Sequence, residues 1–237
     1  MQPNYKIRRL VVLLIIAIVS LSAVAFDMGR REFDAVKPPV INQPIATKQN
    51  SSSVTSVLES LPVKGKSPKT GYARTQFSNG WAKVSECDMR NIILRRDLDA
   101  VRVDEVCKVV SGILRDPYTG REVAFTRGAG TSADVQIDHV VALSNAWQTG
   151  AQQLSVERRY ALANDPLNLI AADGKANQQK SDSDAASWLP SNKAFRCQYV
   201  ARQIAVKQVY SLWVTPAEKS AMETVLLRCP DQQMPVQ

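Results

Sequence analysis

Four cysteines constrain the fold of this chain most strongly, because the segment that precedes them predicts an exported protein. Lys6, Arg8 and Arg9 come before an uncharged apolar run over residues 10–26, near the end of which stands the sequence Ala23-Val24-Ala25. A basic start, an apolar run and a small-x-small site are typical of a secretory signal. Cysteines in exported proteins form disulfides, so we expect two of them, for which three pairings can be drawn.

The same N-terminal segment has a second interpretation as a membrane anchor, since its apolar run of about 17 residues is at the short end for a membrane span. We therefore expect residues 1–25 to be a signal peptide or an anchor. The protein is expected to be secreted or held at the outer face of the cytoplasmic membrane. Residues 26–71 are expected to be a linker with one short helix from Val54, and residues 72–237 the folded domain.

Two local disulfides, Cys87–Cys107 and Cys197–Cys229, are the expected pairing. The first two cysteines lie 20 residues apart in one segment. The other two flank a predicted helical hairpin that turns near Val214. At about 1.5 Å per residue, both lie roughly 22–26 Å from that turn, which sets them side by side. A zinc site is disfavoured, because the chain has no C-x-x-C pair and a single histidine.

The spacing of apolar residues predicts an α+β chain in which short strands alternate with helices. Strands are expected near residues 109–114, 123–125, 135–141 and 167–171. Helices are expected near residues 86–99, 143–149 and 155–163, with a short one after 174 and a C-terminal hairpin over about 195–228.

One histidine, His139, is the only candidate in the chain for an imidazole base. Asp138 precedes it on a predicted strand, Asn168 lies on the next strand, and Asn177 follows nine residues later on a predicted helix. A neutral imidazole can deprotonate water near pH 7. Carboxylate and amide oxygens are hard ligands that suit Mg²⁺. These residue types together favour phosphodiester hydrolysis.

Adjacent residues on a regular strand point to opposite faces, so Asp138 and His139 cannot both serve one site within it. We therefore expect the strand to end or bulge at residues 138–140. The side chain of His139 is expected to face a solvent-filled cleft.

The segments around these residues resemble the HNH (His-Me finger, ββα-metal) nucleases. Residues 135–143, VQIDHVVAL, resemble the first half of that motif. Two segments resemble the second half, NDPLNL at 164–169 and DGKANQQKSD at 173–182. The exported group related to the C-terminal domain of the GmrSD restriction endonuclease is also similar upstream, at residues 87–91, 94–98 and 112–120. The likeness covers roughly residues 72–230.

This resemblance implies a ββα-metal core with an upstream β-hairpin and a C-terminal helical hairpin, stapled by two disulfides. It implies that His139 is the general base and that Asn168 braces the hairpin and orients the imidazole. Asp138 and Asn177 would be metal ligands. Many relatives have a histidine in place of Asn177, and an amide there favours Mg²⁺, with Mn²⁺ as the alternative.

Two basic residues, Lys180 and Arg95, are candidates for contact with a substrate phosphate. Their other interpretations are a solvated helix lysine and an arginine paired with Asp97 or Asp99. The expected substrate is DNA, with RNA as the alternative, cut without marked sequence specificity by a monomer with no evident protein partner.

A competing interpretation is a non-catalytic, disulfide-stapled module that binds polyanions in the cell envelope. The formal charge of +8 is compatible with it. A hydrolase of cell-wall polymer is a third interpretation, but no pair of carboxylates marks one. Such modules have no need of Asp138, His139, Asn168 and Asn177 together, so the sequence favours a metal-dependent endonuclease.

Overall fold

The computed structural model describes residues 53–235 of the 237-residue chain. The predictions for residues 1–25 and for most of the linker lie outside these residues. Within the described part, no helix combines the length and the apolar character that crossing a membrane requires.

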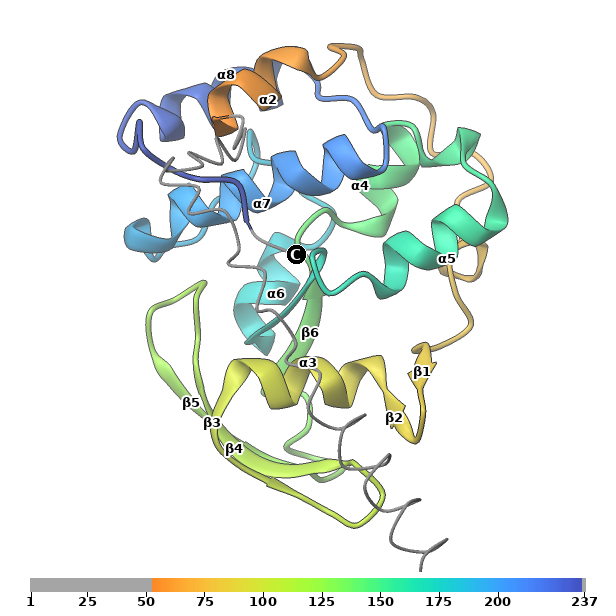
Figure 1. Cartoon of the computed structure of the whole chain (residues 1–237), viewed down its shortest axis with the longest axis vertical. Helices are drawn as coiled ribbons and strands as arrows, with labels where there is room; N and C mark the ends of the chain where they lie inside the picture. Colours follow the sequence, from red (N-terminus) through yellow and green to blue (C-terminus); the bar gives the residue numbers. More distant parts are fainter. Residues whose placement is uncertain (1–52, 236–237) are drawn as a thin grey trace, which may run out of the picture. The chain divides into compact units, whose positions relative to one another are not determined.

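Three antiparallel strands and one helix form the lower part of Figure 1. Helix α3 (Met89–Asp97) leads directly into β3 (Leu98–Val103), and β4 (Val109–Arg115) pairs with both β3 and β5 (Glu122–Thr126). The sequence predicted only the hairpin of β4 and β5. It missed β3 because most side chains of that strand are exposed, so the strand lacks an alternation of apolar and polar residues.

The centre of the structure is a pair of antiparallel strands followed at once by a helix. Strand β6 (Val135–His139) pairs with β7 (Leu169–Asp173) in a regular register as far as His139. Helix α6 (Gly174–Lys180) begins at the next residue and packs against both strands. Figure 1 shows α6 beside β6, between the three-stranded sheet and the upper helices. Any residue larger than glycine at 174 would collide with the carbonyl oxygen of Ala133.

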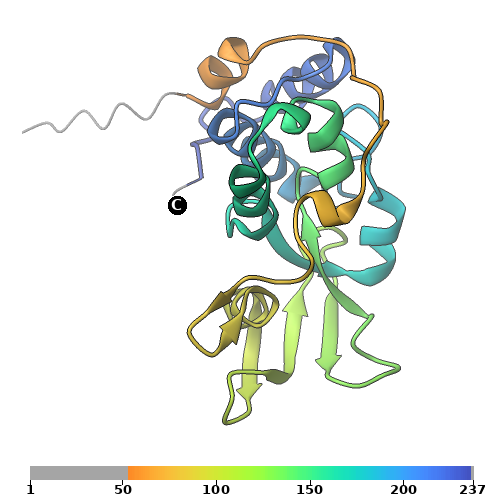
Figure 2. The same cartoon turned by 90° about the vertical axis from the view of Figure 1, so that its right-hand side faces the viewer.

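Two α-helices lie within the connection from β6 to β7. They are α4 (Leu143–Gln148) and α5 (Val156–Asn164), the latter capped by Ser155 as its sequence predicts. Helices α7 (Arg196–Val209) and α8 (Pro216–Leu226) then form the predicted C-terminal hairpin. Figure 2 shows these blue helices and the yellow-green strands at opposite ends of the described part.

The first described helix, α2 (Val54–Ser60), belongs to the same folded unit. It packs against α7 and α8 and buries the apolar residues Val54, Val57 and Leu58. The chain that follows is bound in place, because the carbonyl oxygen of Pro62 accepts a hydrogen bond from the amide of Val214 (3.0 Å). The folded part therefore begins before residue 72, and the predicted boundary is wrong. A short amphipathic helix has an apolar face to bury, and here the domain core receives it.

Both predicted disulfides are present, and both are local. Cys87 and Cys107 have Cα atoms 5.4 Å apart and join strand β2 (Cys87–Asp88), just before α3, to the β3–β4 turn. Cys197 and Cys229 have Cα atoms 6.3 Å apart and join the two arms of the C-terminal hairpin. The prediction of this pairing is confirmed.

Apolar side chains pack on both faces of the β6–β7 pair. One face carries Ile137 and Leu169, which share a core with α3 and the three-stranded sheet. The other face carries Ile170 and Ala172, which share a core with α7 and α8. The strand pair is thus fixed between two cores, and the polar residues at its end are held by a rigid frame.

Candidate active site

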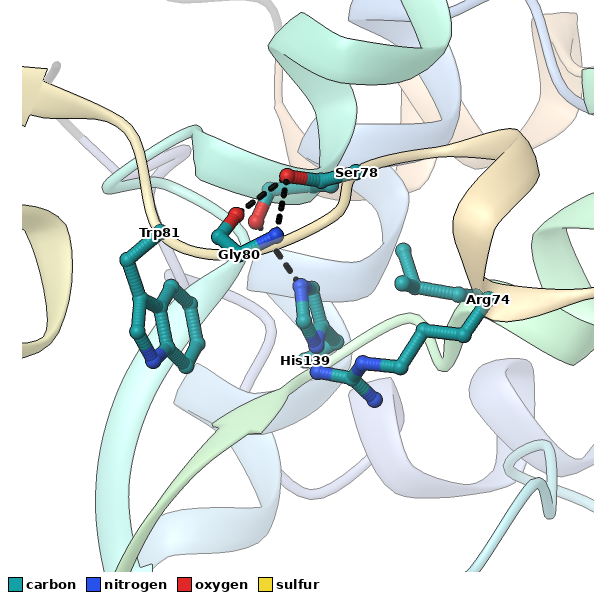
Figure 3. Close-up of a pocket in the computed structure, with 7 residues that line it drawn as sticks. Arg74, Ser78, Gly80, Trp81 and His139 are labelled. Atoms are coloured by element: carbon teal, nitrogen blue, oxygen red, sulfur yellow. Dashed lines mark hydrogen bonds between the residues drawn. The ribbon is translucent and has the colours of Figure 1, made fainter.

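His139 stands at the end of β6 with its ring enclosed by other parts of the chain. Its Nε2 lies 2.8 Å from the carbonyl oxygen of Ala163. The ring of Trp81 is nearly parallel to the imidazole, with 6.0 Å between the ring centres and 11° between the planes. Figure 3 shows the imidazole between Trp81 and the side chain of Arg74. The residue lines two hollows but is only 5% exposed, so its ring is far more enclosed than the predicted solvent-filled cleft implies.

The environment of His139 keeps its imidazole neutral. Burial lowers its pKa from 6.5 to about 3, and the positive charges of Arg74 and Lys180 act in the same direction. The hydrogen bond to Ala163 opposes this shift. Because a carbonyl oxygen can only accept, Nε2 carries the proton and Nδ1 carries the lone pair. The site therefore holds a base in its proton-accepting form.

Asp138 lies next to His139 but points to the other face of β6. The hydroxyl of Tyr118 donates to its Oδ2 (2.5 Å), and the ammonium group of Lys180 lies 3.1 Å from Oδ1 and 3.0 Å from Oδ2. Burial and the nearby carboxylate of Asp138 raise the pKa of Tyr118 well above 10, so its hydroxyl stays a donor. Asp138 is itself 6% exposed. Its charge is balanced by Lys180.

A cleft of about 360 Å³, the metal cleft, adjoins Asp138, His139 and Asn177. Asn177 comes from α6, and its Nδ2 donates to Oε1 of Gln136 on β6 (2.9 Å). That bond turns the amide so that its carbonyl oxygen takes no hydrogen bond from any described residue. Strand and helix together thus bring a carboxylate, an imidazole and an amide to one cleft.

The donors of the metal cleft fit a hydrated Mg²⁺ ion. Asp138 and Asn177 each offer hard oxygen atoms, and Mg²⁺ is commonly held by one or two protein oxygens with water completing its shell. Among the described residues, no three His, Cys, Asp or Glu side chains come together to hold a metal. The set is therefore too sparse for a structural zinc site.

Asn168 lies behind the histidine and is fully buried. Its Oδ1 accepts from the amide of Val141 (2.8 Å), and its Nδ2 donates to the carbonyl oxygens of Val141 and Leu162 (3.3 Å each). Leu162 precedes Ala163, whose carbonyl oxygen holds the imidazole. Asn168 thus ties the end of β6 to the end of α5, the two elements that fix the ring of His139.

The two candidate phosphate contacts lie in different places. Lys180 is fully buried, and its ammonium group also donates to the carbonyl oxygen of His139 (2.9 Å), so it is engaged inside the domain. Arg95 is exposed on α3, where its Nη1 lies 3.6 Å from Sγ of Cys107. Arg95 lines none of the cavities around His139 in the described part.

Asp138 and His139 are adjacent, and strand β6 brings both to one site because it ends at His139. Its pairing is regular through His139 with no bulge, and the chain bends at Val140. The side chains of Asp138 and His139 point to opposite faces of β6. Both still line the metal cleft, because the strand ends at His139. The predicted end of the strand is confirmed, and the alternative of a bulge is not what the structure has.

Two residues beside His139 carry no sequence signal. Arg74 and Trp81 lie before the HNH-like motifs, in a stretch without periodicity. Asp182 lines the metal cleft, where its Oδ2 accepts from Lys69 (2.8 Å) and Ser144 (2.9 Å). These contacts, led by the hydrogen bond from Lys69, lower the pKa of Asp182. Asp182 and Tyr118, by contrast, belong to segments that resemble the nuclease group.

Comparison with known proteins places this chain in a family. Residues 85–225 match the model for "GmrSD restriction endonucleases, C-terminal domain". An uncharacterized secreted protein from Arthroderma benhamiae is 40% identical over 192 residues, which cover 78% of this chain and 91% of that protein. No solved structure matches the chain. The match includes β6, β7 and α6 with all four residues of the predicted site. The chain therefore belongs to the family of GmrSD restriction endonuclease C-terminal domains.

Proposed function

We propose that the protein is an exported, metal-dependent endonuclease that hydrolyses phosphodiester bonds of DNA, with RNA as the alternative substrate. One observation carries the proposal. A buried histidine with a free Nδ1 lone pair borders the same cleft as a carboxylate and an amide oxygen. The order of β6, β7 and α6 agrees with a ββα-metal core, and the family is one of restriction endonuclease domains.

In the proposed reaction, Nδ1 of His139 takes a proton from water as the water oxygen attacks phosphorus. The bond from phosphorus to the 3′-oxygen breaks, and the departing oxygen takes a proton from solvent, which leaves a 5′-phosphate and a 3′-hydroxyl. The carbonyl oxygen of Ala163 keeps the ring in the correct tautomer and faces the charge that forms on it. Since burial disfavours the imidazolium form, the ring readily gives the proton up again.

The proposed cofactor is Mg²⁺, with Mn²⁺ as the alternative, held by Asp138 and Asn177. When bound, such an ion supplies positive charge for the departing 3′-oxygen. Lys180 and Tyr118 hold the carboxylate of Asp138 in a single orientation before any ion arrives. Asn168 holds the backbone on which the base depends.

Export is supported by the relative, which is described as secreted. We propose that the N-terminal segment directs this export and that the protein acts outside the cytoplasm as a monomer. The proposed substrates are therefore nucleic acids found outside the cell.

The test is cleavage of plasmid DNA by the exported chain, purified from the culture medium, with Mg²⁺, with Mn²⁺ and with EDTA. We expect nicked and then linear DNA with either metal and intact DNA with EDTA. His139→Gln should leave the plasmid intact, while Arg121→Gln, at an exposed arginine in the β4–β5 turn, should cut normally. Binding of DNA without metal-dependent cutting would instead favour a non-catalytic polyanion-binding module.

A further inference from the structure

Three hollows near His139 adjoin one another through shared lining residues. The metal cleft shares Arg74 and His139 with a cavity of about 110 Å³, the histidine cavity, which is shown in Figure 3. The histidine cavity shares Ser78, Gly80 and Trp81 with a groove of about 610 Å³, the outer groove. The outer groove is therefore next to the histidine cavity, which in turn is next to the proposed metal ligands.

Residues 74–81, which border all three hollows, lie N-terminal to the segment that matches the family model. They are held firmly all the same. Phe77 is buried at 1% exposure and packs edge-on against Trp147, and the carbonyl oxygen of Gln76 accepts from Arg159 (2.9 Å). Arg74 and Trp81 therefore project from a fixed backbone rather than from a loose arm.

Arg74 is an exposed cation at the edge of the site. Its side chain reaches the metal cleft and the histidine cavity, and Figure 3 shows its guanidinium beside the imidazole. It forms no ion pair with any described carboxylate, unlike Arg96 and Arg115. Its charge also opposes protonation of the base. A phosphate bound at His139 would be a counter-ion for this guanidinium.

The outer groove offers aromatic side chains instead of a positive charge. Its lining includes the rings of Trp81 and Tyr160, the latter 45% exposed, and the 62% exposed side chain of Val156. Among the residues that the structure describes, Glu157 is the only charged one that lines it, and its carboxylate repels phosphate. A planar, uncharged base stacked on aromatic rings suits such a groove, as in proteins that bind single strands. A base in a duplex is already stacked and paired and cannot enter.

We propose that residues 74–81 and Tyr160 form a subsite for one unpaired nucleotide, with its phosphate on Arg74 and its base in the outer groove. The substrate class is then single-stranded nucleic acid. This inference rests on the proposed function, because the subsite is defined relative to His139. It assigns to the segment before the family domain a direct part in choosing the substrate.

The first test compares cleavage of a short labelled single strand with cleavage of the blunt duplex of the same sequence. The exported wild-type chain should cut the single strand with a kcat/KM at least about tenfold higher. Tyr160→Leu, which keeps an apolar side chain and removes the ring, should lower that value about tenfold for the single strand and less than about twofold for the duplex. Tyr160→Phe should restore it. Equal cutting of both substrates by wild type, or equal losses in Tyr160→Leu, would overturn the proposal.

The role of Arg74 is tested by the dependence of KM on salt concentration. Arg74→Gln should raise KM for both substrates and reduce the slope of log KM against log salt by about the value for one phosphate contact. Arg121→Gln, which removes an exposed arginine away from the three hollows, is the matched control and should change neither. An Arg74→Gln variant that behaves like this control would refute the phosphate contact.

Binding separates this inference from the proposed function. Fluorescence anisotropy of the same labelled strand is measured in EDTA with wild type and with Tyr160→Leu, so that no cutting takes place. Tighter binding of the single strand than of the duplex, lost in Tyr160→Leu, supports the subsite even if the chain cuts nothing. Cutting without such a difference in binding contradicts the subsite and leaves the nuclease proposal standing.

Discussion

The buried histidine predicts an unusual dependence of stability on acid. His139 has a pKa of about 3 in the folded protein, against 6.5 for an exposed imidazole. Between these values the unfolded chain binds a proton that the folded chain does not, so the free energy of unfolding falls as the pH drops below about 6.5. The destabilisation that His139 causes is therefore close to zero at neutral pH and grows as the pH falls towards 3.

The size of the effect follows from the two pKa values. At about pH 4.5 the unfolded imidazole lies two pH units below its own pKa and is almost fully protonated, while the folded one is still neutral. Each unit corresponds to about 1.4 kcal/mol, so the wild type should lose about 3 kcal/mol from His139 alone. His139→Gln keeps a polar side chain but cannot titrate, and it should be spared this loss.

Urea unfolding of wild type and His139→Gln at about pH 7 and about pH 4.5 measures the effect. For each protein we take the change in the free energy of unfolding between the two pH values, and we then subtract one change from the other. Carboxylates contribute equally to both proteins, so they cancel in this double difference. Since the chain has one histidine, NMR of material without a histidine tag also reports its tautomer and pKa directly. A double difference below about 0.5 kcal/mol, or an imidazole that titrates near 6.5, would show that the ring is hydrated and that its assigned environment is wrong.

Three further predictions concern the rest of the site and the staples. Asp138→Asn removes the charged ligand of the proposed metal, so the Mg²⁺ concentration for half-maximal cutting should rise at least about tenfold; an unchanged Mg²⁺ titration would rule Asp138 out as a ligand. Lys180→Met leaves Asp138 buried without its partner and should destabilise the fold by about 3–5 kcal/mol in urea unfolding, whereas a loss below about 0.5 kcal/mol is expected for a solvated lysine. Replacing Cys87 and Cys107 together by alanine should cost about 3 kcal/mol and lower Tm, yet leave cutting at low temperature unchanged; lost activity in the folded variant would tie this staple to the site.

The centre of the fold could be predicted from the sequence because its signals are local. The strand ending in His139, the strand from Leu169 and the helix that follows each have clear periodicity or caps. The disulfides were predictable because each joins elements close in sequence. Asp138, His139 and Asn177 meet because the strand pair and the helix that follows it pack directly against one another.

The remainder of the site depends on contacts between distant segments, which leave no periodicity. Lys180 reads as a surface lysine until the fold places it 3.0 Å from the carboxylate of Asp138. Arg74 and Trp81 reach His139 only because Phe77 packs against Trp147, some 70 residues further along the chain. The boundary near residue 72 was wrong for the same reason, since the core that receives α2 is built by the C-terminal helices.

The central claim is that His139 is the base of a nuclease, and the most direct test is the cleavage rate of His139→Gln relative to wild type. The assay uses a labelled oligonucleotide and saturating Mg²⁺ near neutral pH, with circular dichroism to show that the variant is folded. The account predicts a Mg²⁺-dependent rate in wild type that falls by about 100-fold or more in the variant. Since the chain has no second histidine to replace it, equal rates in the two proteins would contradict the account.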